Sequence, residues 1–188
     1  MEDAKLAYKK GLAGIKVIQT NCWLKRVEAF NDGRAKLEKN FTDTAFVAGL
    51  MLYWAEGSKT RGTAISNSDP QLIFIMSNWF QTYYGVNKDS LVVQMHLHSG
   101  QNIENMRQYW SRLTSIPLRN FLTPYIKPPG TGHRTKKLYY GTVKLRVRGV
   151  GSTYMLYEIL GAIAQYNTII YNTPIRIRKW LNKPLYAK

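Results

Sequence analysis

Residues 46–56 form an apolar run that ends in a single carboxylate, and this run constrains the fold more than any other segment. Its sequence, FVAGLMLYWAE, carries no charge before Glu56. Gly57 follows directly and predicts the end of a helix, because glycine is the commonest residue just past a helix C-terminus. Thr42 or Asp43 can cap the beginning. We therefore expect one apolar helix that ends at Glu56.

Glu56 would occupy an electrostatically poor position in that helix. The C-terminal end of a helix carries partial negative charge, so a cation is favoured there and a carboxylate is not. Hard divalent cations take carboxylate and backbone carbonyl oxygens as ligands. Glu56 and Gly57 are therefore candidate metal ligands. The alternative is that Glu56 is a solvated surface residue, because a mismatch with the helix dipole costs only about 1 kcal/mol.

The same segment resembles the signature helix of the LAGLIDADG homing endonucleases. In that motif, small and apolar residues let two helices pack closely, and the last turn delivers an acidic residue followed by glycine. Residues 49–57 occupy the motif positions, with Glu56 on the acidic position and Gly57 on the glycine. Three positions carry residues where the motif usually has smaller or polar ones: Met51, Tyr53 and Trp54. Further segments resemble a subgroup of LAGLIDADG-like proteins from microbial genomes, namely YWAEGSK, AISNSDPQLI, YYGV and YWSRLTSIP, so that the resemblance covers roughly residues 43–165.

The resemblance implies an α+β, LAGLIDADG-like fold and a site-specific double-strand DNA endonuclease that depends on Mg²⁺ or Mn²⁺. One motif per chain implies a homodimer, because two packed signature helices would bring a second Glu56 beside the first and supply more oxygen ligands. Glu56 would bind the metal, and Lys59 would assist by stabilising charge on phosphate. The alternative for Lys59 is that its ammonium complements the helix end.

Two other functions stay open on the same residues. The first is a non-catalytic, regulatory DNA-binding protein of the same fold, which the three substituted motif positions and the single acid favour. The second is an RNA-binding role in intron splicing, which some family members perform. The basic charge of the chain is compatible with both.

The charge of the chain favours a polyanionic partner. The net charge is +16, from 27 Lys and Arg against 11 Asp and Glu. After Glu104 the only acidic residue is Glu158, while the same stretch holds fifteen Lys and Arg. Such an asymmetry suits nucleic acid and, less often, an anionic membrane surface. We expect double-stranded DNA as the partner.

Two segments alternate with the period of a strand and place polar side chains on one face. In residues 90–98 the apolar positions alternate with Gln94, His96 and His98. In residues 137–148 they alternate with Lys144, Arg146 and Arg148. A polar sheet face of this kind matches the width of a DNA major groove, where Arg reads guanine and Gln reads adenine. The alternative is a half-exposed face whose long cationic side chains only solubilise it.

Further basic residues extend the candidate DNA-binding set. Arg61 follows the signature helix, and a loop rich in Pro and Gly carries Arg134, Lys136 and Lys137. His96 and His98 share a strand face and could bind zinc, but no Cys and no nearby acid completes a tetrahedral set. We interpret the two histidines as polar sheet residues or base contacts.

The remaining pattern predicts an α+β layer in which a twisted antiparallel sheet has helices on one face and leaves the other open. Further helices are expected over residues 70–84, with Gly85 as the stop, and over 103–114 and 152–165. Further strands are expected over residues 60–67 and 122–126, where Pro124 restricts the strand to an edge.

The ends of the chain are expected to lie outside the main domain. Residues 1–40 have an apolar stripe at helical spacing and predict a packing or arm helix that Gly33 breaks. The main domain is expected over residues 41–167, and a basic tail over 168–188.

Several classes of protein are not supported. Cys22 is the only cysteine, so no intrachain disulfide is expected, and residues 1–10 lack the apolar core of a signal peptide. No apolar run is long enough to cross a bilayer, so we expect a cytoplasmic protein with no membrane partner. Neither a nucleophile motif nor a phosphate-binding loop occurs.

Overall fold

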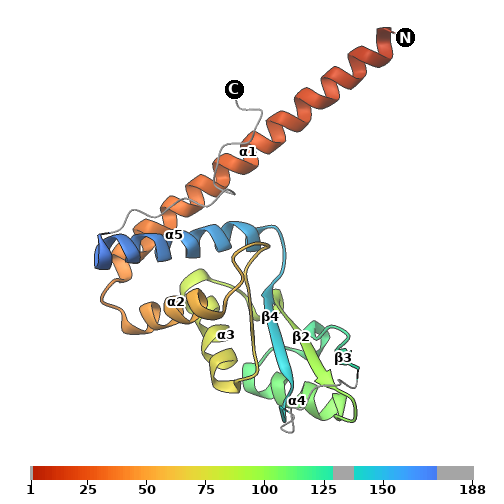
Figure 1. The fold of residues 1–188 in the computed structure, drawn as a ribbon, viewed down its shortest axis with the longest axis vertical. Helices are drawn as coiled ribbons and strands as arrows, with labels where there is room; N and C mark the ends of the chain where they lie inside the picture. Colours follow the sequence, from red (N-terminus) through yellow and green to blue (C-terminus); the bar gives the residue numbers. More distant parts are fainter. Residues whose placement is uncertain (1, 129–137, 173–188) are drawn as a thin grey trace. The chain divides into compact units, whose positions relative to one another are not determined.

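The computed structural model describes residues 2–128 and 138–172, with side chains from residue 11 onward. Contacts divide the described residues into two compact units: residues 2–38 with 157–172, and residues 39–128 with 138–156. The order of elements is α1, α2, β1, α3, η1, β2, α4, η2, β3, β4 and α5 (Figure 1). Helices and a sheet are therefore combined as the sequence predicted, and the α+β class is confirmed.

The first unit is built from α1 (Glu2–Asn40) and most of α5 (Gly151–Tyr171). The expected break at Gly33 is wrong, because α1 continues through it. A Cβ on Gly33 would lie 1.8 Å from the carbonyl oxygen of Glu158, and one on Gly161 would lie 1.9 Å from that of Phe30. These glycines are therefore sites where the two helix backbones touch, and the absence of a side chain permits the contact.

Polar contacts hold the same two helices together. Lys36 Nζ lies 2.5 Å from a carboxylate oxygen of Glu158. The side-chain amide of Gln165 donates to Glu38 at 2.7 Å, while its carbonyl oxygen accepts from Arg34 Nε at 2.9 Å. The helix α5 also runs six residues beyond the predicted end at residue 165. The predicted tail therefore begins inside a helix, and its residues 173–188 lie outside the described part of the chain.

The second unit contains a four-stranded sheet of order β1-β4-β2-β3. Its strands are β1 (Ala64–Asn67), β2 (Leu91–His98), β3 (Tyr125–Lys127) and β4 (Thr142–Val147). β4 pairs antiparallel with β1 and with β2, but β3 pairs parallel with β2. The expectation of a wholly antiparallel sheet is therefore wrong. The physical reason is that α4 (Ile103–Thr114) lies between β2 and β3, and a helical crossover allows the chain to return in the same direction.

The strands are shorter than the sequence predicted. The strand expected over residues 60–67 begins only at Ala64, and the one expected from residue 137 begins at Thr142. The edge strand β3 starts at Tyr125, directly after Pro124, whose ring removes the donor that a paired strand needs. In contrast, α4 has the predicted bounds.

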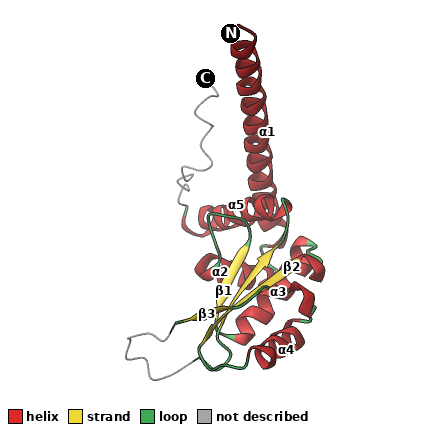
Figure 2. Ribbon diagram, turned by 90° about the vertical axis from the view of Figure 1, so that its right-hand side faces the viewer, coloured by secondary structure: helices red, strands yellow, loops and turns green. Residues whose placement is uncertain are grey.

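The hydrophobic core lies between one face of the sheet and its helices. α3 (Pro70–Tyr84) and α4 lie against one side of the strands (Figures 1 and 2). Val143 and Leu145 of β4 face this side together with Met95 and Leu97 of β2, and each side chain is fully buried. As predicted, α3 ends at Gly85, which is left-handed with φ of 61°. The other face of the sheet carries the polar half of the alternation.

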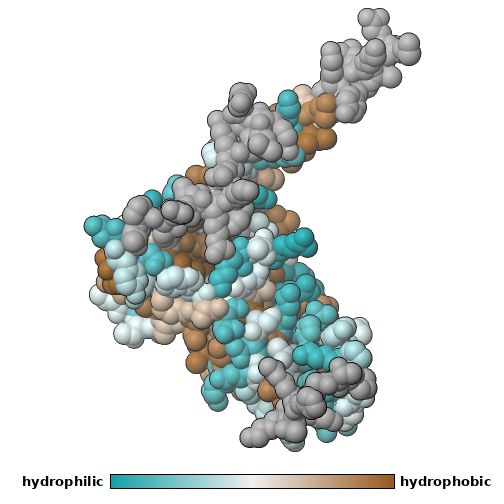
Figure 3. Space-filling model, viewed as in Figure 1, coloured by the Kyte–Doolittle hydropathy of each residue, from teal (hydrophilic) through white to brown (hydrophobic). Residues whose placement is uncertain are grey.

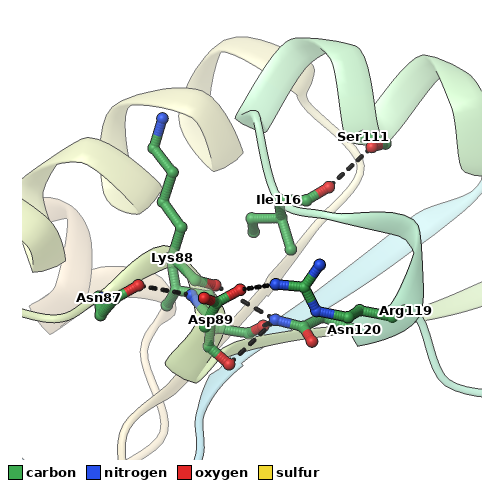
Figure 4. Close-up of polar contacts among 8 residues, drawn as sticks. Asn87, Lys88, Asp89, Ser111, Ile116, Arg119 and Asn120 are labelled. Atoms are coloured by element: carbon green, nitrogen blue, oxygen red, sulfur yellow. Dashed lines mark hydrogen bonds and ion pairs between the residues drawn. The ribbon is translucent and has the colours of Figure 1, made fainter.

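A polar junction fixes the start of β2 to the segment that precedes β3 (Figure 4). The buried side-chain amide of Asn120 donates to the carbonyl oxygens of Lys88, Asp89 and Leu91, at 3.3, 3.0 and 2.9 Å. Beside it, Arg119 forms an ion pair with Asp89. Because the amide nitrogen of one side chain lies within hydrogen-bonding distance of three backbone carbonyls, it holds the two segments in one register.

Candidate nucleic-acid interface

The signature-like helix α2 (Thr44–Glu56) begins and ends where the sequence predicted. The Asp43 carboxylate caps it by accepting from the amides of Ala45 and Phe46 at 3.0 and 3.1 Å. Tyr83 of α3 donates to the same carboxylate at 2.8 Å. The bond from the amide of Phe46 and that from Tyr83 are the main causes that lower the pKa of Asp43. Asp43 is therefore ionised at neutral pH and ties α2 to α3.

Glu56 and Lys59 lie at the C-terminal end of α2 in different environments. Glu56 is exposed. Lys59 folds back, and its Nζ donates to the carbonyl oxygens of Gly57 at 2.6 Å and Tyr53 at 3.3 Å. Lys59 therefore complements the negative end of the helix, as the alternative interpretation of this residue describes.

One chain does not provide a complete site for a divalent cation here. Among the described residues, no group of three or more His, Cys, Asp or Glu side chains could hold a metal. Glu56 is the one carboxylate at this helix end, and the Gly57 carbonyl already accepts the Lys59 ammonium. A hard cation needs six or more oxygen ligands. Within one chain, water or another molecule would therefore have to supply most of the ligands of Mg²⁺, and a metal at the Gly57 carbonyl would displace Lys59.

The two glycines of the motif have structural uses within the chain. A Cβ on Gly49 would lie 2.2–2.5 Å from the indole of Trp79, whose Nε1 donates to the carbonyl of Phe46 at 3.1 Å. A Cβ on Gly57 would lie 2.6 Å from the Tyr53 carbonyl oxygen. Gly57 has an extended backbone, so close approach rather than left-handed geometry requires glycine there. Gly49 therefore packs against α3 of its own chain.

The outward face of α2 is rich in small and apolar residues. Its exposed or half-buried positions include Ala45, Ala48, Leu52 and Ala55, at helical spacing. Trp54 is 40% exposed, and Phe74 and Ile75 of α3 are 41% and 44% exposed. Brown and pale atoms lie at the surface over α2 and α3 (Figure 3). In contrast, Tyr53 is fully buried, and its hydroxyl donates to the Ser58 carbonyl at 2.7 Å.

The open face of the sheet gathers the polar residues that the strand alternation predicted, except Arg148, which lies beyond the end of β4. Lys144 lies at the centre, between Gln94 of β2 and Ser66 of β1 in the hydrogen-bonded register. Arg146 lies two residues along, between Val92 and Ala64. We define the open face by its half-exposed polar residues together with exposed Ser66 and Tyr125: Ser66, Gln94, His96, His98, Tyr125, Lys127, Thr142, Lys144 and Arg146.

His96 occupies a positively charged part of the open face. Burial lowers its pKa from the usual value, and the nearby charges of Lys127 and Lys144 lower it further. The imidazole is therefore neutral at pH 7 and can both donate and accept hydrogen bonds. It packs on the ring of Tyr125 with centroids 5.6 Å apart.

The other predicted DNA-binding residues fall in different places. Arg61 and Arg148 are exposed in the loops just before β1 and just after β4. Arg134, Lys136 and Lys137 lie outside the described residues. Four members of the open face were not among the predicted DNA-binding residues: Ser66, Tyr125, Lys127 and Thr142. Tyr125 and Lys127 were missed because β3 has only three residues, too few for a periodic signal.

Comparison with known proteins does not assign this chain to a family. No protein-family model, no curated protein and no solved structure matches this chain. None of the described helices combines the length and apolar character that a membrane span requires.

Proposed function

We propose that this protein binds duplex DNA through the open face of its sheet. One observation carries the proposal: the four strands contain Lys127, Lys144, Arg146 and two histidines but no acidic residue. The ion pairs among the described residues lie elsewhere: one joins α1 to α5, one lies within α4 and one lies beside η1. Cations that have no acid beside them favour an anionic partner, and phosphate contacts dominate the affinity of proteins for DNA.

The residue types on the open face suit a groove as well as a backbone. Gln94 and Lys144 are register neighbours, so an amide that can pair with adenine stands beside an ammonium that can bind phosphate. β2 and β4 are the two central strands of the sheet, so their side chains lie in the middle of the face that would meet the major groove. The fully buried Val143 and Leu145 on the opposite face hold these side chains in place.

The active form in this proposal is a homodimer that packs through α2. The outward small residues Ala45, Ala48 and Ala55 permit close approach of a second helix, and the neighbouring exposed apolar side chains of α2 and α3 would be covered. A two-fold dimer reads a roughly palindromic site.

Binding is tested by fluorescence anisotropy with a randomised 30-base-pair duplex and with a structured RNA of equal phosphate number as competitor. We expect the duplex to bind more tightly than the RNA, with affinity that falls steeply as salt rises. Preference for the RNA would instead support the splicing role.

A second candidate function is metal-dependent DNA cleavage, which the exposure of Glu56 at the end of α2 favours. In the dimer, two Glu56 carboxylates would stand together and DNA phosphates and water would complete the ligand shell. With Mg²⁺ or Mn²⁺, the wild type should produce discrete cuts that Glu56→Gln abolishes while its DNA affinity stays nearly the same. Equal cleavage by the variant excludes the role of Glu56, and binding without cuts by either protein leaves a regulatory DNA-binding protein.

A further inference from the structure

A cavity of about 290 Å³ opens where β4 ends and α5 begins. Its walls include three arginines that come from separate segments: Arg61 before β1, Arg146 in β4 and Arg148 after β4. No acidic residue lines it. Because the cavity lies within the second unit and involves Arg146, it adjoins the open face.

The three arginines have no partner for their charge within the described chain. The backbone amide of Arg148 donates to the Ser90 carbonyl, but no hydrogen bond or ion pair joins the guanidinium group of Arg61, Arg146 or Arg148 to another described residue. Like charges gathered around one cavity repel each other, and an anion in the cavity offsets that repulsion. Guanidinium groups bind phosphate oxygens with two parallel hydrogen bonds, so three of them suit a tetrahedral anion.

The start of α5 adds to the same electrostatic field. This 21-residue helix begins at Gly151, and Ser152 lines the cavity. The positive end of a helix dipole favours an anion at that position. The Ser152 hydroxyl accepts from the amide of Thr63 at 2.8 Å, and the Thr63 hydroxyl donates to the Ser152 carbonyl at 2.9 Å. These buried bonds attach the loop before β1 to the N-terminus of α5. Arg61, which lies in that loop, is therefore held near the N-terminus of α5.

The remaining wall is apolar and fixed. Val92 is 3% exposed, and Leu122 lies beside it in the cavity wall. The amide of Leu122 donates to the carbonyl of Val93 at 2.9 Å, and Asn120 fixes the chain two residues before it (Figure 4). The lining of the cavity therefore combines three cationic side chains with apolar ones such as Val92 and Leu122.

We propose that this cavity is a phosphate-binding site in which Arg61, Arg146 and Arg148 hold the phosphate oxygens. A phosphodiester of the DNA backbone, a terminal phosphate of a strand and free inorganic phosphate share this chemistry. The assignment to the DNA backbone rests on the proposed function, whereas the binding of phosphate itself does not.

The first arm of the test measures inorganic phosphate binding to the full chain by calorimetry and by the shift in Tm, at constant ionic strength with chloride as the reference. Arg61→Gln and Arg148→Gln change exposed side chains and should fold. Each should weaken phosphate binding about tenfold. The control is Arg112→Gln, which removes the same charge from an exposed position on α4 and should leave phosphate binding unchanged.

The second arm measures the affinity of the same proteins for one duplex with and without 5′-phosphates. Equal weakening for both duplexes in Arg61→Gln and Arg148→Gln assigns the site to the backbone, and weakening only for the phosphorylated duplex assigns it to a strand end. Phosphate binding without any DNA binding would support the site and overturn the proposed function. The site would be overturned if inorganic phosphate did not bind and if Arg61→Gln and Arg148→Gln weakened DNA binding no more than Arg112→Gln does. The proposed function would then still stand.

Discussion

The two faces of the sheet share the same strands but obey different constraints. On the helix side, Val143 and Leu145 are fully buried beside Met95 and Leu97. On the open side, Lys144 alternates with these residues and remains half-exposed. Packing determines which residues fit on the helix side, because adding or removing one methylene in a dense core changes the stability. Nothing in the packing of the described chain demands a cation on the open side, so the open face is where a partner would act.

Replacing Leu145 with alanine should have the largest effect on the helix side of the sheet. Removing a fully buried leucine side chain leaves a cavity and should lower the free energy of unfolding by about 2–5 kcal/mol. Urea unfolding followed by circular dichroism measures the change. The matched control, Lys144→Gln on the adjacent position, should stay within about 0.5 kcal/mol of the wild type. Equal losses in the two variants would contradict the division of the faces.

Asn120→Ala tests whether polarity alone marks a functional residue. Asn120 is polar, yet it is buried and donates to three backbone carbonyls. Its loss removes these hydrogen bonds, although the Lys88 carbonyl keeps the bond from the Leu91 amide, and should cost about 1–3 kcal/mol of unfolding free energy. DNA affinity, measured below the unfolding transition, should change little. If Asn120→Ala had normal stability but bound DNA poorly, Asn120 would have to act in DNA binding rather than in folding.

Lys144→Gln should change DNA binding rather than stability. If the ammonium contacts one phosphate, the slope of log K against log salt becomes less steep by about 0.9. Anisotropy titrations between 50 and 200 mM salt, a range in which such slopes are resolved, measure it. Arg112→Gln on α4 is the charge-matched control and should leave the slope at its wild-type value. An identical slope in Lys144→Gln would place this residue outside the contact surface.

His96 should show the smallest effect, as a change in titration. Its pKa is lowered first by burial and then by Lys127 and Lys144, so Lys144→Gln should return it part of the way to about 6.5. Because the native pKa lies below the unfolded value, the unfolded chain takes up the proton first as pH falls. The neutral form of His96 therefore contributes stability above pH 6.5 that is lost as pH falls toward the native pKa.

Nuclear magnetic resonance titration of the His96 ring protons measures this change directly. A His96 pKa that is the same in the wild type and in Lys144→Gln would show that the charge of Lys144 does not act on His96.

Local patterns in the sequence predicted the elements whose causes are local. The bounds of α4, the Asp43 cap of α2 and the left-handed Gly85 follow from residues that act within one turn. The division of β4 into apolar and cationic faces follows from strand alternation. These features need no information about distant segments.

The failures concern contacts between distant segments. Gly33 was expected to break α1. Instead, a glycine is needed at this position because the backbone of Glu158, which is far along the chain, lies against it. The parallel pairing of β3 depends on where α4 returns the chain, and the strand itself is too short to show a period. The cavity that joins Arg61 to Arg146 and Arg148 likewise has no signature in any one segment.

The most direct test of the account places a photo-crosslinker on each side of the sheet. In a Cys22→Ser background, Ser66→Cys carries the label on the exposed part of the open face, and Asn78→Cys carries it on the exposed side of α3. Both labelled proteins are irradiated with the same duplex DNA. The account predicts a crosslink from position 66 that competitor duplex removes, and little or none from position 78. Crosslinking from position 78 alone, or none from either position in a protein that binds DNA, would contradict it.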